Sequence, residues 1–373
     1  MQYTLVESSA DLAALVERFA GGDAVIVDTE FMRRDTFYPQ VALVQLCFPA
    51  MPDMAWLIDP LAVEDLEPLA ELLQDEKVIK VVHSASEDLE VFQTSLGCQP
   101  VPLFDTQKAA ALVGLGFGLG YRRLVEQLTG QELDKDETRS DWLKRPLTPA
   151  QLDYASADVI PLLPVFRDLQ ARADARDRLD WILEEGAIAT ASAAAPSPPS
   201  YLKVKSAWKL KPRQLAVLRA ICDWRDTRAR ELDKPRSWIL ADKICLAIAQ
   251  RLPRSEGQLR NVPDMPHAVV RKQGHVLLES IESVMGLDEG ELPSALPGPL
   301  NAPQRDLLKR LKQAAAELAR QWQVEPEALL PSRDYETMVR LGSGEEVAVP
   351  PHWSGWRRDI LIEPLLELAQ GGA

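Results

Sequence analysis

Acidic side chains that could hold a metal ion follow a short apolar run near the start of the chain. The run Val25–Val27 is followed by Asp28, Thr29 and Glu30. Because side chains alternate along a β-strand, Asp28 and Glu30 leave such a strand on the same face, about 7 Å apart. Two carboxylates at that spacing repel each other unless a cation or another donor neutralises them. Two ordinary acids at a solvated strand end are the alternative interpretation of this tripeptide.

A third acid, Asp88, lies in the first turn of a helix predicted after the apolar run 78–82. This helix presents Leu89 and Phe92 on its apolar face. Asp88 precedes Val91 and Phe92 by three and four residues, which places its carboxylate on the inward side of the first turn. An inward aspartate needs a partner. A favourable interaction with the helix N-terminus is its alternative role.

A phenol and a fourth acid, Tyr154 and Asp158, share one face of a further predicted helix. Thr148 is a suitable N-cap for this helix, and Gln151 three residues later completes a capping box. Tyr154 and Asp158 are four residues apart, so their side chains lie one above the other beside an apolar stripe. A local hydrogen bond between the two explains this spacing as well as a functional site does.

Together these side chains suit a site for two divalent metal ions. Hard cations such as Mg²⁺ and Mn²⁺ take carboxylate oxygens as ligands, so no histidine or cysteine is needed. Two such ions about 4 Å apart can stabilise both the attacking and the leaving oxygens of a phosphodiester under hydrolysis. The candidate site residues are Asp28, Glu30, Asp88, Tyr154 and Asp158.

The elements that must position these residues are strands and helices in the first half of the chain. The β-branched runs 24–27, 41–44 and 78–82 alternate with helical patterns, which predicts an α/β domain. The low-complexity stretch 187–200 ends in several prolines and is the predicted linker. After it, helical spacing dominates, so the second half is predicted to be all-α. The helical segments expected there are 212–233, 237–251 and 303–322.

The motifs around these acids resemble those of a known group of nucleases. Asp28-Thr29-Glu30-Phe31, His83-Ser84-Ala85 with Asp88, and Tyr154-Ala155-Ser156-Ala157-Asp158-Val159 are similar to the three exonuclease motifs of the DEDDy superfamily. More narrowly, the chain resembles the ribonuclease D family, because both VDTEFMRRDTFYPQVALVQL and SDWLKRPLTPAQLDYASADV look like ribonuclease D surroundings. The resemblance covers almost the whole chain.

The resemblance implies a role for each of the five residues. Asp28 would bridge both metal ions, Glu30 and Asp158 would hold the ion that activates water, and Asp88 would support the second ion. Tyr154 would orient the attacking water. The implied activity is that of a 3′-to-5′ exoribonuclease that releases nucleoside 5′-monophosphates. The implied substrates are transfer RNA precursors and other small structured RNAs.

The second half of the chain resembles the helical domains that accompany this nuclease. Residues 211–287 are similar to the HRDC nucleic-acid-binding domain, and the tail from about Ala295 looks like a second, more divergent HRDC-like domain. The implied architecture is an RNase H-like α/β exonuclease domain with a mixed sheet, followed by two all-α HRDC-type domains. The expected bounds are 1–200 including the linker 187–200, then 201–290, then 291–373.

Two helical stretches of the second half also share a short sequence pattern. Ala229-Arg230 is followed by Pro235, and Ala319-Arg320 is followed by Pro326, about 90 residues later. This match predicts a duplicated helical module. Composition alone could also produce such a match.

The charges are distributed unevenly along the chain. The net charge is −14, yet residues 1–200 hold 16 basic and 33 acidic residues, whereas residues 201–300 hold 17 and 12. An acidic module repels RNA where metal is absent, and a basic segment offers phosphate contacts. We therefore expect RNA capture and RNA cleavage to belong to different domains. The residues expected to contact RNA are Lys203, Lys205, Lys209, Lys211 and Arg213.

Further residues near these motifs allow two interpretations each. Arg33 and Arg34, after the first motif, could touch substrate phosphate or lie in a solvated loop. Trp238, close to the basic segment, could stack on a base or pack in a core. His83 could be mistaken for a general base, but with Tyr154 present we favour a packing or supporting role.

Several classes of protein are excluded by composition. The four cysteines contain no CxxC pair, so they are expected to be buried free thiols. No apolar run approaches the roughly 18 residues that span a bilayer, and the acidic start differs from a signal peptide. We expect a cytoplasmic monomer with no membrane partner. Two alternatives remain open, namely an exonuclease of the same fold that acts on DNA and a non-catalytic RNA-binding adaptor.

Overall fold

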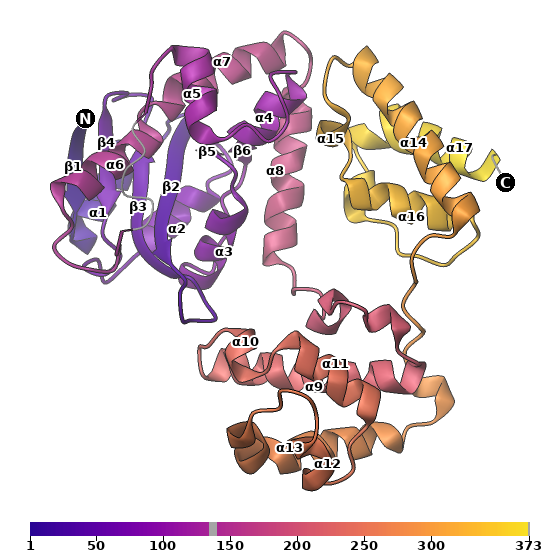
Figure 1. The fold of residues 1–373 in the computed structure, drawn as a ribbon. Coiled ribbons are helices and arrows are strands. Elements are labelled where there is room, and N and C mark those ends of the chain that lie inside the picture. Colours follow the sequence, from indigo (N-terminus) through magenta and orange to yellow (C-terminus); the bar gives the residue numbers. More distant parts are fainter. Residues whose placement is uncertain (134–139, 372–373) are drawn as a thin grey trace. The chain divides into compact units, whose positions relative to one another are not determined.

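The computed structural model describes residues 1–133 and 140–371 (Figure 1). The chain forms two compact units. The first contains residues 1–32, 39–195 and 300–373, and the second contains residues 33–38 and 196–299. The division into three domains stays a prediction, and the residues 134–139 and 372–373 within it lie outside the described part.

The first unit is built on a six-stranded mixed sheet. The strand order is β1-β4-β3-β2-β5-β6. The antiparallel pairs are β2 with β3 and β3 with β4, whereas β1–β4, β2–β5 and β5–β6 are parallel. The expected α/β architecture with a mixed sheet is confirmed. The strands are β1 Gln2–Val6, β2 Ala24–Met32, β3 Gln40–Cys47, β4 Met54–Ile58, β5 Ile79–Val82 and β6 Leu103–Asp105.

Helices cover both faces of this sheet, and successive side chains of strand β2 point to opposite faces. Ala24 and Ile26 belong to one apolar core, and Val25 and Val27 belong to the other. The first core is closed by α4 Thr106–Leu112, α5 Tyr121–Thr129, α6 Pro149–Val159 and α7 Leu162–Asp174. The second core is closed by α1 Ser9–Arg18, α2 Glu67–Gln74 and α3 Ser86–Ser95.

The predicted linker 187–200 is mostly helical, so this prediction is wrong over much of its length. Helix α8 spans Leu179–Ala194, and only the residues after it leave the helical conformation before Ser200. Alanine is the best helix former, so a low-complexity alanine run continues a helix until proline interrupts it. Helix α8 lies against the edge strand β6, where a Cβ on Gly186 would come within 2.0 Å of the carbonyl oxygen of Leu103.

The second unit is all-helical between residues 200 and 299, as expected. The segment 237–251, predicted as one helix, is interrupted at Leu240 because this residue is extended and buried, with its carbonyl accepting a hydrogen bond from Arg225 at 3.3 Å. The helices are α9 Pro212–Glu231, α10 Arg236–Ile239, α11 Asp242–Arg251, α12 Glu256–Arg260 and α13 His267–Met285.

The C-terminal helices of the first unit pack on helix α8. The indole of Trp356 stacks on that of Trp181 at 4.5 Å, and Arg357 pairs with Glu185. Arg178 donates to the carbonyl oxygen of Trp322 at 2.6 Å. These helices are α14 Ala302–Gln321, α15 Pro326–Leu329, α16 Ser332–Gly342 and α17 Glu363–Gly371.

The suspected duplication has a counterpart in the structure. Helices α9, α10 and α11 have 20, 4 and 10 residues, and α14, α15 and α16 have 20, 4 and 11. After each long helix one residue, Asp233 or Gln323, adopts a positive φ. This match supports a repeated helical module, while a second HRDC domain stays a prediction.

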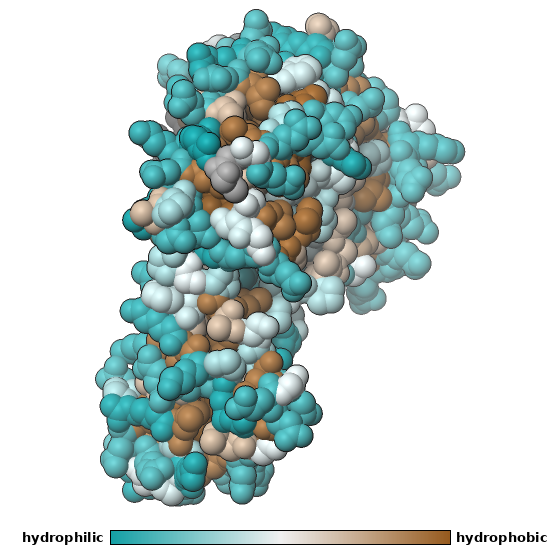
Figure 2. All heavy atoms as spheres, turned by 90° about the vertical axis from the view of Figure 1, so that its right-hand side faces the viewer, coloured by the Kyte–Doolittle hydropathy of each residue, from teal (hydrophilic) through white to brown (hydrophobic). Residues whose placement is uncertain are grey.

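Apolar side chains do not form one continuous band on the face drawn in Figure 2. They occur there as separate small areas among hydrophilic residues. Within residues 1–133 and 140–371, no helix is long and apolar enough to cross a membrane.

Candidate active site

The first two acids lie where strand β2 extends beyond its neighbour β5. Strand β5 pairs with β2 only from Ala24 to Ile26. The next residues on the same face of β2 are Asp28 and Glu30, and both are half-buried. The predicted common face of these two carboxylates is therefore the face covered by α6.

Helix α6 brings the third-motif residues to the same face. The predicted capping box is present, since Thr148 Oγ1 accepts from the Gln151 amide at 3.2 Å and Gln151 Oε1 accepts from the Thr148 amide at 3.0 Å. Ala155 and Val159 anchor the helix in the core beside Ile26. With the helix fixed in this way, carboxylate oxygens of Asp28, Glu30 and Asp158 lie within 4.8 Å of one another.

Asp88 approaches from the other helical layer. Its helix α3 packs through Leu89 and Phe92 into the core that contains Val25 and Val27. Thr29 points to this layer, and its hydroxyl donates to Asp88 Oδ1 at 2.5 Å. Asp88 is only 7% exposed, which confirms its predicted inward orientation.

The turn before α3 is held by a further acid, Asp105 at the end of β6. Its carboxylate accepts from the backbone amides of Ser84 at 3.0 Å and Ala85 at 3.2 Å. Ser84 has a φ of 61°, a conformation that costs free energy unless the surroundings hold it. Asp105 therefore fixes the backbone conformation of the turn that positions α3 and, with it, Asp88.

Burial raises the pKa of all four acids predicted for the site, Asp28, Glu30, Asp88 and Asp158. Loss of hydration is the largest cause in each case. It acts with the neighbouring carboxylates to raise the pKa of Glu30 to about 9 and that of Asp28 well above its usual range. The pKa of Asp158 rises to about 7, although Arg122 opposes the shift, and the pKa of Asp88 rises to about 6, although Thr29 opposes it.

These side chains fit a divalent cation. The donors are carboxylate oxygens, the ligands that hard cations prefer, and their mutual repulsion is relieved by positive charge. Gln45 lies directly across from Asp28 on β3 and is fully buried, yet neither atom of its side-chain amide has a hydrogen-bond partner among the described residues. A buried amide of this kind requires a further polar group in the site.

A cleft of about 680 Å³ opens over the cluster. Arg122 and Arg123 at the start of α5 line it together with Tyr154. Tyr121 closes the wall by donating its hydroxyl to the carbonyl oxygen of Ala157 at 2.6 Å. His83 Nδ1 is 2.9 Å from Thr106 Oγ1, and burial lowers the pKa of His83, consistent with a supporting role.

Sequence reasoning gave no role to several residues of this site, among them Tyr121 and Arg123 in the cleft wall. Thr29 donates a hydrogen bond to Asp88, and Asp105 accepts one from the turn that precedes α3. The positive charge of Arg122 lowers the pKa of Asp158. Gln45 carried a usable signal, because a glutamine inside an apolar strand must find a partner. Arg122 had none, since only the folded chain brings α5 to α6.

The residues predicted to contact RNA have different environments in the second unit. Arg213 Nη1 donates to the carbonyl oxygens of Val284, Met285 and Leu287 at 3.0–3.1 Å, so this guanidinium caps helix α13. The other four side chains are exposed, and these are Lys203, Lys205, Lys209 and Lys211.

Comparisons with known families and proteins agree along the whole chain. The profile of a 3′-5′ exonuclease family matches residues 3–174, and that of the HRDC domain matches residues 214–281. Ribonuclease D of Pseudomonas paraeruginosa is 41% identical, over 97% of this chain and 96% of that protein. Ribonuclease D of Escherichia coli is 33% identical, over 99% of both chains.

Solved structures give the same result. The crystal structure of Escherichia coli RNase D, described as an exoribonuclease involved in structured RNA processing, matches with a TM-score of 0.92 and 33% identity. The match covers 100% of this chain and 99% of that one. The catalytic core of RRP6 from Trypanosoma brucei matches with a TM-score of 0.58 and 25% identity, over 76% of this chain and 80% of that one.

Proposed function

The chain belongs to the ribonuclease D family of 3′-to-5′ exoribonucleases, and we propose that it matures the 3′ ends of transfer RNA precursors and other small structured RNAs. Each reaction hydrolyses the terminal phosphodiester and releases a nucleoside 5′-monophosphate. The observation that carries the proposal is the convergence of Asp28, Glu30 and Asp158 under an open cleft. The residues that we assign to catalysis are Asp28, Glu30, Asp88, Tyr154 and Asp158.

The family depends on divalent metal, and we propose two Mg²⁺ or Mn²⁺ ions in this site. Asp28, Glu30 and Asp158 would hold one ion, and Asp28 and Asp88 would hold the other. When bound, such ions stabilise charge on the attacking and leaving oxygens. Support comes from the oxygen-only donor set and from the electrostatic coupling of Asp88 to Asp28 and Asp158.

Tyr154 orients the attacking water in this proposal. Burial and the neighbouring carboxylates raise the pKa of its phenol above the usual range. The phenol therefore keeps its proton at neutral pH and acts through a hydrogen bond, not as an ionised base. Its helix position four residues before Asp158 aims both groups at the same cleft.

Two arginines supply positive charge beside the acids. Arg122 and Arg123 line the cleft, and the charge of Arg122 opposes the rise in the pKa of both Asp158 and Tyr154. Guanidinium groups bind phosphate through several hydrogen bonds, so these residues suit the backbone of the RNA end. A monomeric state and a cytoplasmic location stay predictions.

A time course on 5′-labelled RNA with a short 3′ overhang beyond a stem tests the proposal. Wild type with Mg²⁺ should give a ladder that shortens from the 3′ end, and EDTA or Asp28→Asn should abolish it. Asp53→Asn is the matched control, because Asp53 is exposed and outside the cleft. A ladder that persists in Asp28→Asn would refute the site.

A DNA strand of the same sequence tests the alternative substrate. The relatives are named as ribonucleases, so we expect the DNA strand to be shortened more slowly. Faster shortening of DNA would favour the alternative exonuclease. The non-catalytic adaptor is disfavoured by the intact carboxylate cluster.

A further inference from the structure

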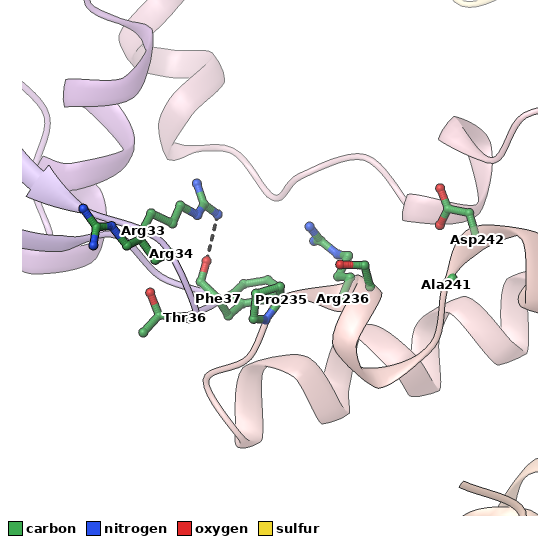
Figure 3. A pocket seen from close by; sticks show the side chains of 9 residues that line it. Arg33, Arg34, Thr36, Phe37, Pro235, Arg236, Ala241 and Asp242 are labelled. Carbon is green, nitrogen blue, oxygen red and sulfur yellow. Dashed lines mark hydrogen bonds between the residues drawn. The ribbon is translucent and has the colours of Figure 1, made fainter. Parts of the chain in front are cut away.

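The second unit contains a pocket of about 530 Å³ between the loop 33–38 and the region of helices α10 and α11 (Figure 3). Arg33, Arg34 and Phe37 extend from the loop, and Pro235 and Arg236 come from the helical side. None of these residues belongs to the carboxylate cluster. The pocket therefore needs an explanation of its own.

The loop is held against the helices by several contacts. Asp233 Oδ1 accepts from the backbone amides of Phe37 at 2.8 Å and Tyr38 at 3.1 Å. The ring of Phe37 is 9% exposed and lies 4.8 Å from the guanidinium of Arg236. Arg33 donates to the carbonyl oxygen of Phe37 at 2.8 Å. The pocket is thus formed before any ligand binds, which lowers the entropic cost of binding.

The lining of the pocket is positively charged. Its charged residues are three arginines, Arg33, Arg34 and Arg236, and one aspartate, Asp242. Asp242 is already paired with the buried Arg225, whose Nη1 is 2.5 Å from its carboxylate. Asp226 orients Arg236 through an ion pair at 3.0 Å. The surrounding unit, residues 33–38 and 196–299, holds 19 basic and 13 acidic residues.

An exposed aromatic residue is the chain neighbour of one of the lining residues. Trp238 follows the lining residue Ser237 and is 63% exposed, a costly state for a large apolar side chain. Lys234 Nζ lies 5.8 Å from the centre of its ring. An exposed indole beside basic groups is the arrangement with which proteins hold single-stranded nucleic acid, through base stacking and phosphate contacts.

We propose that this pocket binds single-stranded RNA, with a backbone phosphate on its arginines and a neighbouring base on Trp238. The proposal deepens the proposed function, on which it rests, by adding a phosphate-and-base subsite separate from Lys203–Lys211. Arg33 follows Glu30 by three residues in the sequence, so the loop that holds the phosphate continues the strand that carries two metal ligands.

The test measures binding of 5′-labelled single-stranded RNA to the full chain carrying Asp28→Asn, so that no substrate is consumed. Arg34→Gln should weaken binding and reduce the slope of log K against log salt by about one. Arg34→Lys should restore most of the affinity. Arg271→Gln, at an exposed arginine of α13 outside the lining, is the matched control and should change neither quantity.

Trp238→Ala tests the stacking half of the proposal. It should weaken binding about tenfold, and RNA with abasic positions should lose the difference between variant and parent. Both altered side chains are exposed, so the melting temperature should stay unchanged. Unchanged affinity and salt slope in Arg34→Gln, or unchanged affinity in Trp238→Ala, would overturn the subsite. Failure of the proposed function would appear separately, as the absence of Mg²⁺-dependent shortening of RNA by the wild-type chain.

Discussion

The hydroxyl of Thr29 on β2 donates a hydrogen bond to the carboxylate of Asp88 on α3, 59 residues later in the chain. The two side chains belong to the helical layer opposite the one that carries Asp158. Thr29 thus lies between Asp28 and Glu30, whose side chains point to the opposite face of the sheet, and its hydrogen bond fixes Asp88 to the same strand. The tripeptide Asp28-Thr29-Glu30 therefore contacts the acids on both faces of the sheet.

Loss of this hydrogen bond should impair catalysis without unfolding the chain. Thr29→Val keeps the shape of the 6% exposed side chain and removes the donor, so we expect kcat/KM to fall about 10- to 100-fold. The bond favours ionised Asp88, whose pKa is about 6, so its loss raises that pKa and moves the acid limb of the pH profile to higher pH. Thr29→Ser should restore both.

The stability of the metal-free chain should fall as pH rises. The pKa values of Glu30 and Asp158 are about 9 and about 7 in the folded chain, against about 4 when unfolded. Between these limits the folded chain binds more protons than the unfolded chain, so the free energy of unfolding decreases with increasing pH. Melting temperatures in EDTA at about pH 5.5, 7 and 8.5 measure this slope.

Addition of Mg²⁺ should raise the melting temperature, and more so at high pH. Metal binds the ionised carboxylates, and only the folded chain brings them together. Asp158→Asn should reduce the gain, whereas Asp53→Asn should behave like wild type. Equal melting temperatures in EDTA and Mg²⁺ at about pH 8 would contradict a site strained by repulsion.

Truncation of Arg225 should destabilise the helical second unit. This residue is 2% exposed and pairs with Asp242, and its Nη2 donates to Ser200 Oγ at 3.2 Å. Arg225→Ala leaves a cavity and uncompensated acids, at a cost of about 3–5 kcal/mol. Arg225→Met fills the space and should cost less. Denaturant unfolding followed by tryptophan fluorescence measures the difference.

The stacked indoles of Trp181 and Trp356 should bind the C-terminal helices to α8. Trp356→Ala removes this contact, and we expect a loss of about 2–3 kcal/mol. Trp356→Phe retains an aromatic ring and should lose less. If the alanine variant unfolded at the wild-type temperature, the C-terminal helices would not contribute to the stability of the first unit.

The sequence predicted those parts of the site that depend on local periodicity. Alternation along β2 placed Asp28 and Glu30 on one face, and the Thr148 capping box fixed where α6 begins. The spacing of Asp88 from Val91 and Phe92 was enough to predict that its side chain points inward. The layer from which it enters could not be predicted, because that depends on which face of the sheet α3 packs against.

Other features depend on contacts between distant residues and were missed for that reason. The break at Leu240 follows from its burial beside Arg225, although the local pattern continues a helix. For the loop 33–38 the sequence predicted only that Arg33 and Arg34 contact phosphate or lie in solvent. Its packing could not be predicted, because Asp233, which accepts a hydrogen bond from Phe37, is almost 200 residues later. The alanine run before residue 195 was ambiguous between linker and helix, and packing of α8 on β6 decided for helix.

The passage of β2 between two helical layers has a consequence for the timing of activity during protein synthesis. The carboxylates come from residues 28 to 158, and the last arrives with α6, after the other layer has been made. A nascent chain on the ribosome lacks Asp158 until that helix has been translated. If Asp158 is needed for catalysis as we propose, the growing polypeptide has no exonuclease activity until α6 has been translated and folded.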